Sequence, residues 1–413
     1  MFVAIGNTPR DYAWGSTTAI AELLGREPTG RPEAELWLGA HPGSPARIAE
    51  SSQAAVGGAV DLAAWIDAEP DTALGGLPRL PFLLKVLAAA GPLSLQAHPD
   101  AARAAAGFAA EDAAGIPLDA PERNYRDPHP KPEIIVALSE RFVALCGFRP
   151  VEEARAVLHG LGLDELTAQL ASLPALVGWL LAGGPEVDAL VDRVTARAAP
   201  VPAAVPPASG GRTKLKEIAP EPDHNGAEVV DSGPDSVVLG ALETVRVLAA
   251  AFPGDAGILS ALLLNRVTLT RGEALYLPAG NIHAYLSGVG IELMTASDNV
   301  LRGGLTRKHI DVAELLAVLD FAPTPIPYLT PDVSPGLAVY RPDGAGFALA
   351  HVTADAHLTL TGPAIALCTA GSFRLEGAGT SGAIARGESL YITPDEAGLA
   401  VAGAGDLFVA TTA

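Results

Sequence analysis

Cysteine is scarce in this chain of 413 residues, which contains only Cys146 and Cys368. Two cysteines cannot build a disulfide framework or a cysteine-based zinc knuckle, and such low usage is typical of a reducing compartment. We therefore expect a cytoplasmic protein. The first residues lack a basic segment followed by a long apolar run, so no signal peptide is expected. No window holds about 18 uninterrupted, strongly apolar residues, so no membrane-spanning helix and no membrane partner are predicted.

Positive charge is also limited, because 27 lysine and arginine residues stand against 47 aspartate and glutamate residues. The formal net charge of −20 disfavours binding to nucleic acids and to anionic membranes. An anionic small molecule could bind only where a local group of lysine and arginine side chains overcomes this negative field.

Glycine and proline are abundant, with 44 and 35 residues respectively, and 49% of the residues are hydrophobic. This composition favours turn-rich β structure with sizeable cores over a helical bundle. At about 100–200 residues per domain, the length predicts two to four domains.

The segment RGEALYLPAGNIH, residues 271–283, predicts a strand, a tight turn and the start of a second strand. Pro278 ends the first strand because proline has no N–H to donate, and Gly280 suits the turn. His283 begins the next strand. We expect a turn across residues 287–290 and a further strand carrying Glu292, so that a hairpin holds the imidazole on its inner face.

This pattern resembles the second motif of the cupin superfamily, whose members are small β-barrels with an internal metal. Ser287 stands where the motif usually has asparagine. A lone histidine on a strand is more often a hydrogen-bonded core residue than a ligand, so the hypothesis depends on ligands elsewhere in the chain.

The stretch PLSLQAHPD, residues 92–100, supplies candidate ligands. Leucines alternate with Ser94, Gln96 and His98, so these three polar residues share one face of a strand. That face is turned either to solvent or to the inside of a polar barrel, and the context of His283 favours the inside.

Glu133 follows Lys131 and a proline at the start of the apolar segment 134–138. It is either an exposed carboxylate at a strand edge or the ligand that completes a set with Gln96, His98 and His283. One amide oxygen, two imidazoles and one carboxylate suit Zn²⁺, although other divalent ions also fit. Such a site keeps a position open for water or substrate and can act as a Lewis acid.

Two apolar segments contain further polar positions. In AELWLGAHP, residues 34–42, Glu35 and His41 either flank a packed Trp37 or lie near a site. Lys85 interrupts the strand PFLLKVLAA, where a lysine either extends outward or faces a polar cavity.

The spacing of apolar residues in 150–254 predicts a helical insertion, with a Pro/Ala-rich linker near residues 198–212. The insertion divides a first barrel into residues 1–149 and 255–319. Residues 320–413 predict a second barrel, because RGESLYITPDEAG, residues 386–398, matches residues 271–283 at an offset of 115. Gly398 and Leu407 stand in place of His283 and Glu292, so this barrel is expected to bind no metal.

Five motifs occur in the order found in type I mannose-6-phosphate isomerases, and the chain resembles that family over nearly its whole length: AELWLGAHP, LSLQAHPD, KPEI, LPAGNIHAYL and SDNVLRGGLTRKHID. The resemblance implies a mainly β fold with two cupin-type jelly-roll barrels and an α-helical insertion. It also implies an enzyme that interconverts mannose 6-phosphate and fructose 6-phosphate through an enediol. We expect it to act as a monomer with one zinc ion per chain.

The resemblance also implies site roles: zinc on Gln96, His98, Glu133 and His283, catalysis by Arg302, Lys131 and Glu292, and substrate binding by Ser94, Asp298 and Lys308. The reaction needs a base that moves a proton between C2 and C1, and a cation that stabilises charge on the oxygens. Arg302 suits the second task. Lys131 and Glu292 are both candidates for the first, and the sequence does not choose between them.

Two positions depart from the family. Gly91 replaces a lysine linked to phosphate binding, so restoring a lysine at this position is expected to lower KM. Pro130 replaces a histidine proposed in ring opening, and His129, one residue earlier, is the nearest substitute.

Two other classes of function fit parts of the pattern. One is a different metal-dependent cupin enzyme, either an isomerase for another sugar phosphate or an oxygenase. The other is a non-catalytic sugar-binding cupin, which should lack a metal ligand or Arg302, and here none is missing.

Overall fold

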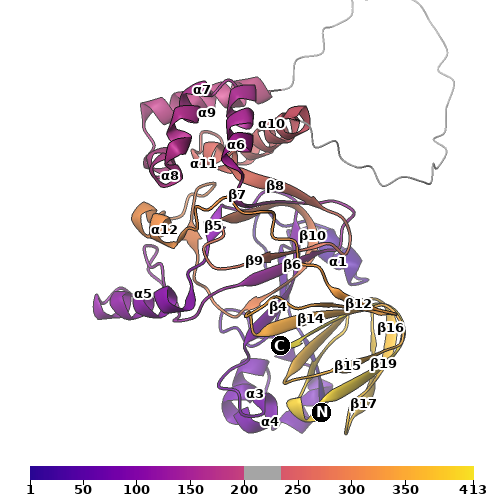
Figure 1. The fold of residues 1–413 in the computed structure, drawn as a ribbon. Coiled ribbons are helices and arrows are strands. Elements are labelled where there is room, and N and C mark those ends of the chain that lie inside the picture. Colours follow the sequence, from indigo (N-terminus) through magenta and orange to yellow (C-terminus); the bar gives the residue numbers. More distant parts are fainter. Residues whose placement is uncertain (200–233) are drawn as a thin grey trace, which may run out of the picture.

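The protein consists of two antiparallel β-sheets and a group of helices packed at one end. The computed structural model describes residues 1–199 and 234–413. Figure 1 shows helices α6 to α11 at one end, the first sheet in the middle, and the strands of the second sheet at the other end. The predicted mainly β fold with a helical part is confirmed.

The first sheet has nine strands, and its long strand β10 pairs with β4, β5, β6 and β7. The strands are β2 (Glu35–Leu38), β4 (Phe82–Ala89), β5 (Gln96–Ala97), β6 (Glu133–Ala137), β7 (Phe142–Phe148), β8 (Leu264–Leu269), β9 (Ala274–Leu277), β10 (His283–Thr295) and β11 (Leu301–Arg302). Because β10 has neighbours from distant parts of the chain, it brings together every segment that carries a predicted ligand.

The second sheet has ten strands, and two of them come from the N-terminal segment that the sequence assigned to the first barrel. β1 pairs with β18, and β3 pairs with β1. The strands are β1 (Phe2–Gly6), β3 (Arg47–Ile48), β12 (Asp332–Ser334), β13 (Leu337–Tyr340), β14 (Phe347–Val352), β15 (Ala356–Thr359), β16 (Ala364–Glu376), β17 (Ser381–Ala385), β18 (Ser389–Ile392) and β19 (Gly398–Thr412). The two ends of the chain are therefore tied into one sheet.

Six of the twelve α-helices in the described residues, α6 to α11, lie between β7 and β8 in the chain. The α-helices are α1 (Ala19–Leu23), α2 (Glu50–Gln53), α3 (Leu62–Ala68), α4 (Pro70–Leu74), α5 (Ala101–Ala113), α6 (Val151–Gly160), α7 (Asp164–Thr167), α8 (Leu173–Ala182), α9 (Pro185–Ala198), α10 (Pro234–Ala251), α11 (Gly257–Ala261) and α12 (Val312–Val318). Short 3₁₀ turns are η1 (Ala54–Val56), η2 (Ala168–Ala171) and η3 (Pro394–Glu396). Within these ranges, no helix is long and apolar enough to cross a membrane. Residues 200–212 of the predicted linker lie outside the described residues.

Strand β10 differs from the predicted hairpin, because His283–Thr295 form one strand of 13 residues with a bulge near its start. Two glycines suggested a turn, but they allow close packing instead. A Cβ at Gly288 would lie 2.7 Å from the Cδ2 atom of Phe142, and Gly290 is equally crowded. The metal-site histidine and Glu292 therefore lie on one continuous strand.

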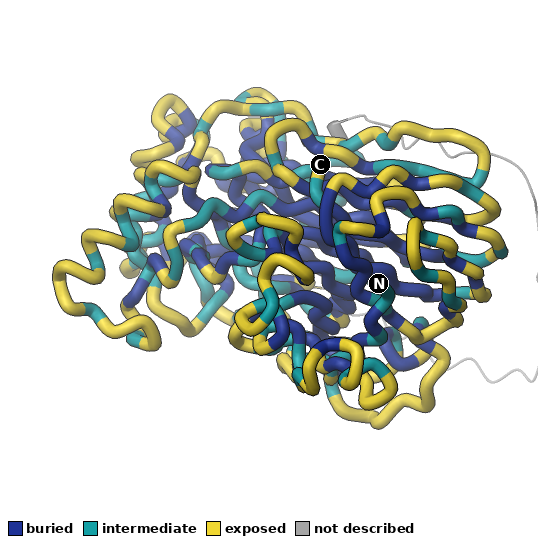
Figure 2. Tube along the Cα trace, turned by 90° about the horizontal axis from the view of Figure 1, so that it is seen from below, coloured by how far each residue is buried: buried dark blue, intermediate teal, exposed yellow. Residues whose placement is uncertain are grey.

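Apolar clusters hold these parts together. One joins the helices to the first sheet and includes Leu180 and Leu264. A second joins the two sheets and includes Leu84 and Phe347, and a third fills the second sheet around Phe373. Figure 2 shows the buried residues concentrated along the strands, with exposed residues on loops and outer helix turns. The first sheet thus has well-packed support for a polar interior.

Candidate active site

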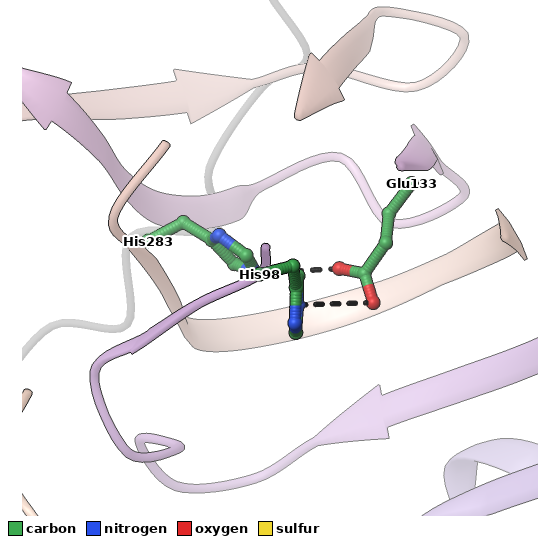
Figure 3. Close-up of side chains that lie close together, drawn as sticks. All are labelled: His98, Glu133 and His283. Carbon is green, nitrogen blue, oxygen red and sulfur yellow. Dashed lines mark ion pairs between the residues drawn. The ribbon is translucent and has the colours of Figure 1, made fainter. Parts of the chain in front are cut away.

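Three buried side chains converge in the first sheet, and they form the one group of metal-ligating type found among the described residues (Figure 3). His98 follows β5, Glu133 begins β6 and His283 begins β10. Their ligand atoms all lie within 4.8 Å of one another. His98 Nε2 is 3.4 Å from Glu133 Oε1, and His283 Nε2 is 3.2 Å from Glu133 Oε2. This is the convergence expected of ligands that share one cation.

Backbone carbonyls orient both imidazoles. His98 Nδ1 lies 2.7 Å from the carbonyl oxygen of Asn299, and His283 Nδ1 lies 3.0 Å from that of Asn281. A carbonyl can only accept, so each Nδ1 carries the proton and each Nε2 keeps a free lone pair. Both lone pairs are therefore available to a metal.

The centre leaves buried polar atoms without partners, which indicates that it fits a cation. Neither His98 Nε2 nor Glu133 Oε2 has a hydrogen-bond partner, although both are buried. Such atoms destabilise a protein unless something satisfies them. The amide of Gln96 lies 3.2 Å from His283 Nε2, and a rotation of that amide presents its oxygen at the same point.

The charges around the centre favour ligand forms that bind metal. Burial, with a further contribution from Lys131, lowers the pKa of His98 to about 4, so the imidazole is neutral at pH 7. Burial alone would raise the pKa of Glu133, but Lys131 and His98 hold it well below its usual value. Lys131 Nζ lies 2.9 Å from Glu133 Oε1.

An open cavity of about 850 Å³ lies beside the centre, and most predicted site residues line it. The lining includes Ser94, Gln96, Lys131, Glu133, Glu292, Asp298, Arg302 and Lys308. The two histidines lie just behind this wall. Gln96 links the parts, because it pairs with His283 on β10 and with Arg302 on β11.

Lys85 is a cavity residue whose direction the sequence left open. Strand β4 runs between β2 and β10, so Lys85 lies opposite both Trp37 and Glu292. Its Nζ is 3.1 Å from Glu292 Oε2 and 3.8 Å from Glu35 Oε1. Burial and the neighbouring carboxylates Glu133 and Glu35 raise the pKa of Glu292 despite the opposing effect of Lys85. The cavity therefore holds carboxyls whose pKa values are shifted in opposite directions, with that of Glu133 lowered and that of Glu292 raised.

Four of the seven lysine and arginine residues that line the cavity are not used in ion pairs with other described residues: Arg126, Arg302, Arg307 and Lys308. Burial, together with the charges of Arg302 and Arg126, lowers the pKa of Lys308. None of the four has an ion-pair partner among the described residues, although the chain is strongly acidic. This is the local positive field that an anionic ligand requires.

Two expectations from the sequence do not fit this cavity. His129, the suggested substitute for the missing histidine, is not among the lining residues, whereas His41 is. Gly91 also does not line it, and borders instead a second hollow of about 470 Å³ beside Arg141 and Glu243. Pro92 lines both hollows, so residues that are neighbours in the chain face different hollows. The local sequence therefore does not tell which hollow Gly91 borders.

A mainly β fold with a buried His–Glu–His group beside a basic cavity defines the class as a metalloenzyme for an anionic small molecule. Residues 2–151 match the model of the phosphomannose isomerase type I catalytic domain. The mannose-6-phosphate isomerase of Escherichia coli K12 is 37% identical over 97% of each chain. That of Rattus norvegicus is 33% identical over 85% of this chain and 81% of its own.

Solved structures agree with these relatives. A zinc-bound mannose 6-phosphate isomerase superimposes with a TM-score of 0.81 at 33% identity, covering 100% of this chain and 99% of the other. A mutant of phosphomannose isomerase from Salmonella typhimurium gives 0.81 at 32% identity, with the same coverage. The chain belongs to the mannose-6-phosphate isomerase family, which confirms the resemblance and the prediction of an isomerase.

Proposed function

We propose that the protein interconverts mannose 6-phosphate and fructose 6-phosphate as a zinc-dependent aldose–ketose isomerase. The observation that carries the proposal is that a His–Glu–His centre adjoins a cavity lined by four cations without ion-pair partners among the described residues. A hexose phosphate has the two matching features, sugar oxygens for the centre and an anion for the cations.

Gln96, His98, Glu133 and His283 would hold one zinc ion. When bound, the ion supplies Lewis-acid stabilisation of charge on the sugar oxygens. The neutral His98 and the ionised Glu133 are already in the forms that such an ion requires.

Lys131 and Glu292 are the proposed acid–base groups for proton transfer between C2 and C1. Burial raises the pKa of Glu292, which moves a carboxyl toward the range where it can take and return a proton near neutral pH. Lys131 Nζ, 2.9 Å from Glu133, is placed to donate hydrogen bonds to sugar oxygens at the same wall. Transfer of the C2 proton to the base leaves an enediolate with its charge on O1. Movement of the O2 proton to O1 and return of the abstracted proton to C1 then give the ketose.

Arg302 is assigned to the growing negative charge on the enediolate oxygens, because it lies beside Gln96 at the edge of the centre. Lys308 is assigned to the phosphate, with Arg126 and Arg307 adding positive charge. Ser94 and Asp298 are assigned to sugar hydroxyls. We also propose a cytoplasmic monomer, and the two free buried cysteines fit a reducing compartment.

A coupled assay with mannose 6-phosphate, run with and without a chelator, tests the proposal. We expect turnover that chelation abolishes and added zinc restores. A zinc-loaded protein without turnover would overturn the proposal, and iron-dependent oxygen uptake would indicate an oxygenase instead.

A further inference from the structure

His41 is a buried histidine in the cavity wall that the proposed proton transfer does not use. It follows β2, lines the cavity and is 4% exposed. Trp37 packs edge-on against its ring, with centroids 4.9 Å apart at an angle of 78°. A histidine held so firmly beside a substrate cavity has one fixed orientation.

Hydrogen bonds determine which ring nitrogen carries the proton. His41 Nδ1 accepts a hydrogen bond from the backbone N–H of Gly43 at 3.1 Å. A neutral imidazole has a single proton, so Nε2 is the donor. That nitrogen lies 3.3 Å from Oδ1 of Asp298. The ring therefore directs an N–H at the carboxylate.

Asp298 is held on its other side by the loop around the metal centre. Its backbone N–H donates to Oδ2 of Asp127 at 2.8 Å. The next residue, Asn299, supplies the carbonyl that orients His98. The Asp298 side chain is 47% exposed, and its Oδ2 has no hydrogen-bond partner in the described structure. One carboxylate oxygen is thus occupied and the other is free at the cavity.

The charged and titratable groups that face Asp298 are Lys131, Arg126, Asp127 and His41. Burial alone would raise the pKa of Asp298. The hydrogen bond from His41 and then the charges of Lys131 and Arg126 overcome this effect and lower its pKa. The carboxylate consequently remains an ionised acceptor in neutral solution.

We propose that His41 is a positioning residue that holds one oxygen of Asp298, so that the other oxygen accepts a hydrogen bond from a sugar hydroxyl. This inference rests on the proposed function, because it takes a sugar phosphate as the ligand of the cavity. A carboxylate free at both oxygens rotates about its terminal torsion. Fixing one oxygen before the sugar arrives reduces the ordering required on binding.

Substitution of His41 by phenylalanine, asparagine and glutamine tests the hydrogen bond. His41→Phe removes the donor, and His41→Asn places its amide near the position of Nδ1, too short to reach Asp298. Both should lower kcat/KM for mannose 6-phosphate by about 10–100-fold, with zinc content unchanged. His41→Gln carries an amide close to the position of Nε2 and should recover most of the activity.

A double-variant cycle shows whether His41 acts through Asp298. After Asp298→Asn, the further change His41→Asn should cost less than about twofold, because the two losses are not independent. In His41→Asn alone, the pKa of Asp298 should rise, and the acidic limb of kcat/KM against pH should move to higher pH. His129→Asn is the matched control, since His129 lies outside the cavity lining, and its pH profile should not move.

The outcomes separate this inference from the proposed function. An active wild-type protein with unchanged kcat/KM and pH profile in His41→Asn overturns the positioning role, as do fully additive losses in the cycle. A zinc-loaded wild-type protein that does not turn over mannose 6-phosphate overturns the proposed function instead. Loss in the asparagine variant, recovery in the glutamine variant and a shifted acidic limb together support the inference.

Discussion

The two sheets contain the same strand–turn–strand unit but differ in what the unit encloses. β9 and β18 have the same length, and β10 and β19 begin at His283 and Gly398, 115 positions apart. In the first sheet the unit carries a buried histidine and the buried Glu292, whereas Leu407 stands at the position equivalent to Glu292. The strand–turn–strand unit therefore forms both with and without the metal-ligating residues.

The difference shows what a polar interior requires. Buried imidazoles and carboxylates cost free energy unless they are paired or bound to a metal. The first sheet contains such groups, including the orphaned atoms His98 Nε2 and Glu133 Oε2, whereas the cluster around Phe373 in the second sheet is apolar. The second sheet supports the molecule, packing through Phe347 and Phe408 against the first.

Removing a metal ligand from the first sheet should have the largest effect on activity, because it deletes the feature that the second sheet lacks. His98→Ala should lower kcat/KM by at least about 10³-fold and abolish zinc binding, because the ion contributes several kcal/mol to charge stabilisation. Circular dichroism should show a retained fold, since the cores are apolar. His351 in the second sheet, paired with Asp406 at 2.7 Å, is the control. His351→Ala should leave turnover within about twofold; full activity in zinc-free His98→Ala would contradict the assignment.

Arg302 and Arg271 provide the second comparison. Arg302 has no ion-pair partner at the cavity, whereas Arg271 joins the sheets through Asp406 at 2.8 Å. Arg302→Ala should lower kcat and kcat/KM together by about 10²–10³-fold, and Arg302→Lys should recover only part, since an ammonium lacks the planar fork. Arg271→Ala should reduce stability by ~0–1 kcal/mol and leave kcat nearly unchanged. Near-normal kcat in Arg302→Ala would remove it from the mechanism.

Metal content and melting temperature test whether one sheet alone binds zinc. We expect one zinc ion per chain, and removal by a chelator should cost about 2.7 kcal/mol of stability when free zinc had been at 100 times its Kd. Gly398→His should add no second ion, because position 398 is exposed, pairs with Thr359 and belongs to no group of metal-ligating side chains among the described residues. Two tightly held zinc ions per wild-type chain would contradict the comparison. Elemental analysis and calorimetry make both measurements.

Local chemistry made much of the site predictable from the sequence. Turn glycines indicated the position of His283, and a proline at its first turn marked the start of α9. The predicted strand carrying Ser94, Gln96 and His98 is shorter than expected, because β5 covers only Gln96–Ala97 and His98 follows it. The structure brings these segments together as a ligand set requires.

Pairing between distant segments was not predictable in the same way. β1 joins the second sheet through β18, almost 390 residues later, which no local pattern encodes. The packing of Gly288 against Phe142 depends on a neighbouring strand, so the glycine suggested a turn. The contact between His41 and Asp298 joins positions 257 apart and has no signal in either segment.

Gly91→Lys should have the smallest effect, contrary to the expectation from the sequence that it would lower KM. A side chain is tolerated there, because a Cβ at Gly91 would meet no atom within 4 Å. The position borders the second hollow, where Glu243 lies between Arg141 and Arg266. A lysine at position 91 would extend toward that carboxylate rather than toward the cations of the cavity. KM for mannose 6-phosphate should therefore stay within about twofold, with kcat unchanged. A severalfold lower KM would mean that the ammonium passes Pro92 and reaches the phosphate, and that a lysine here strengthens the basic cavity across the boundary between the two hollows.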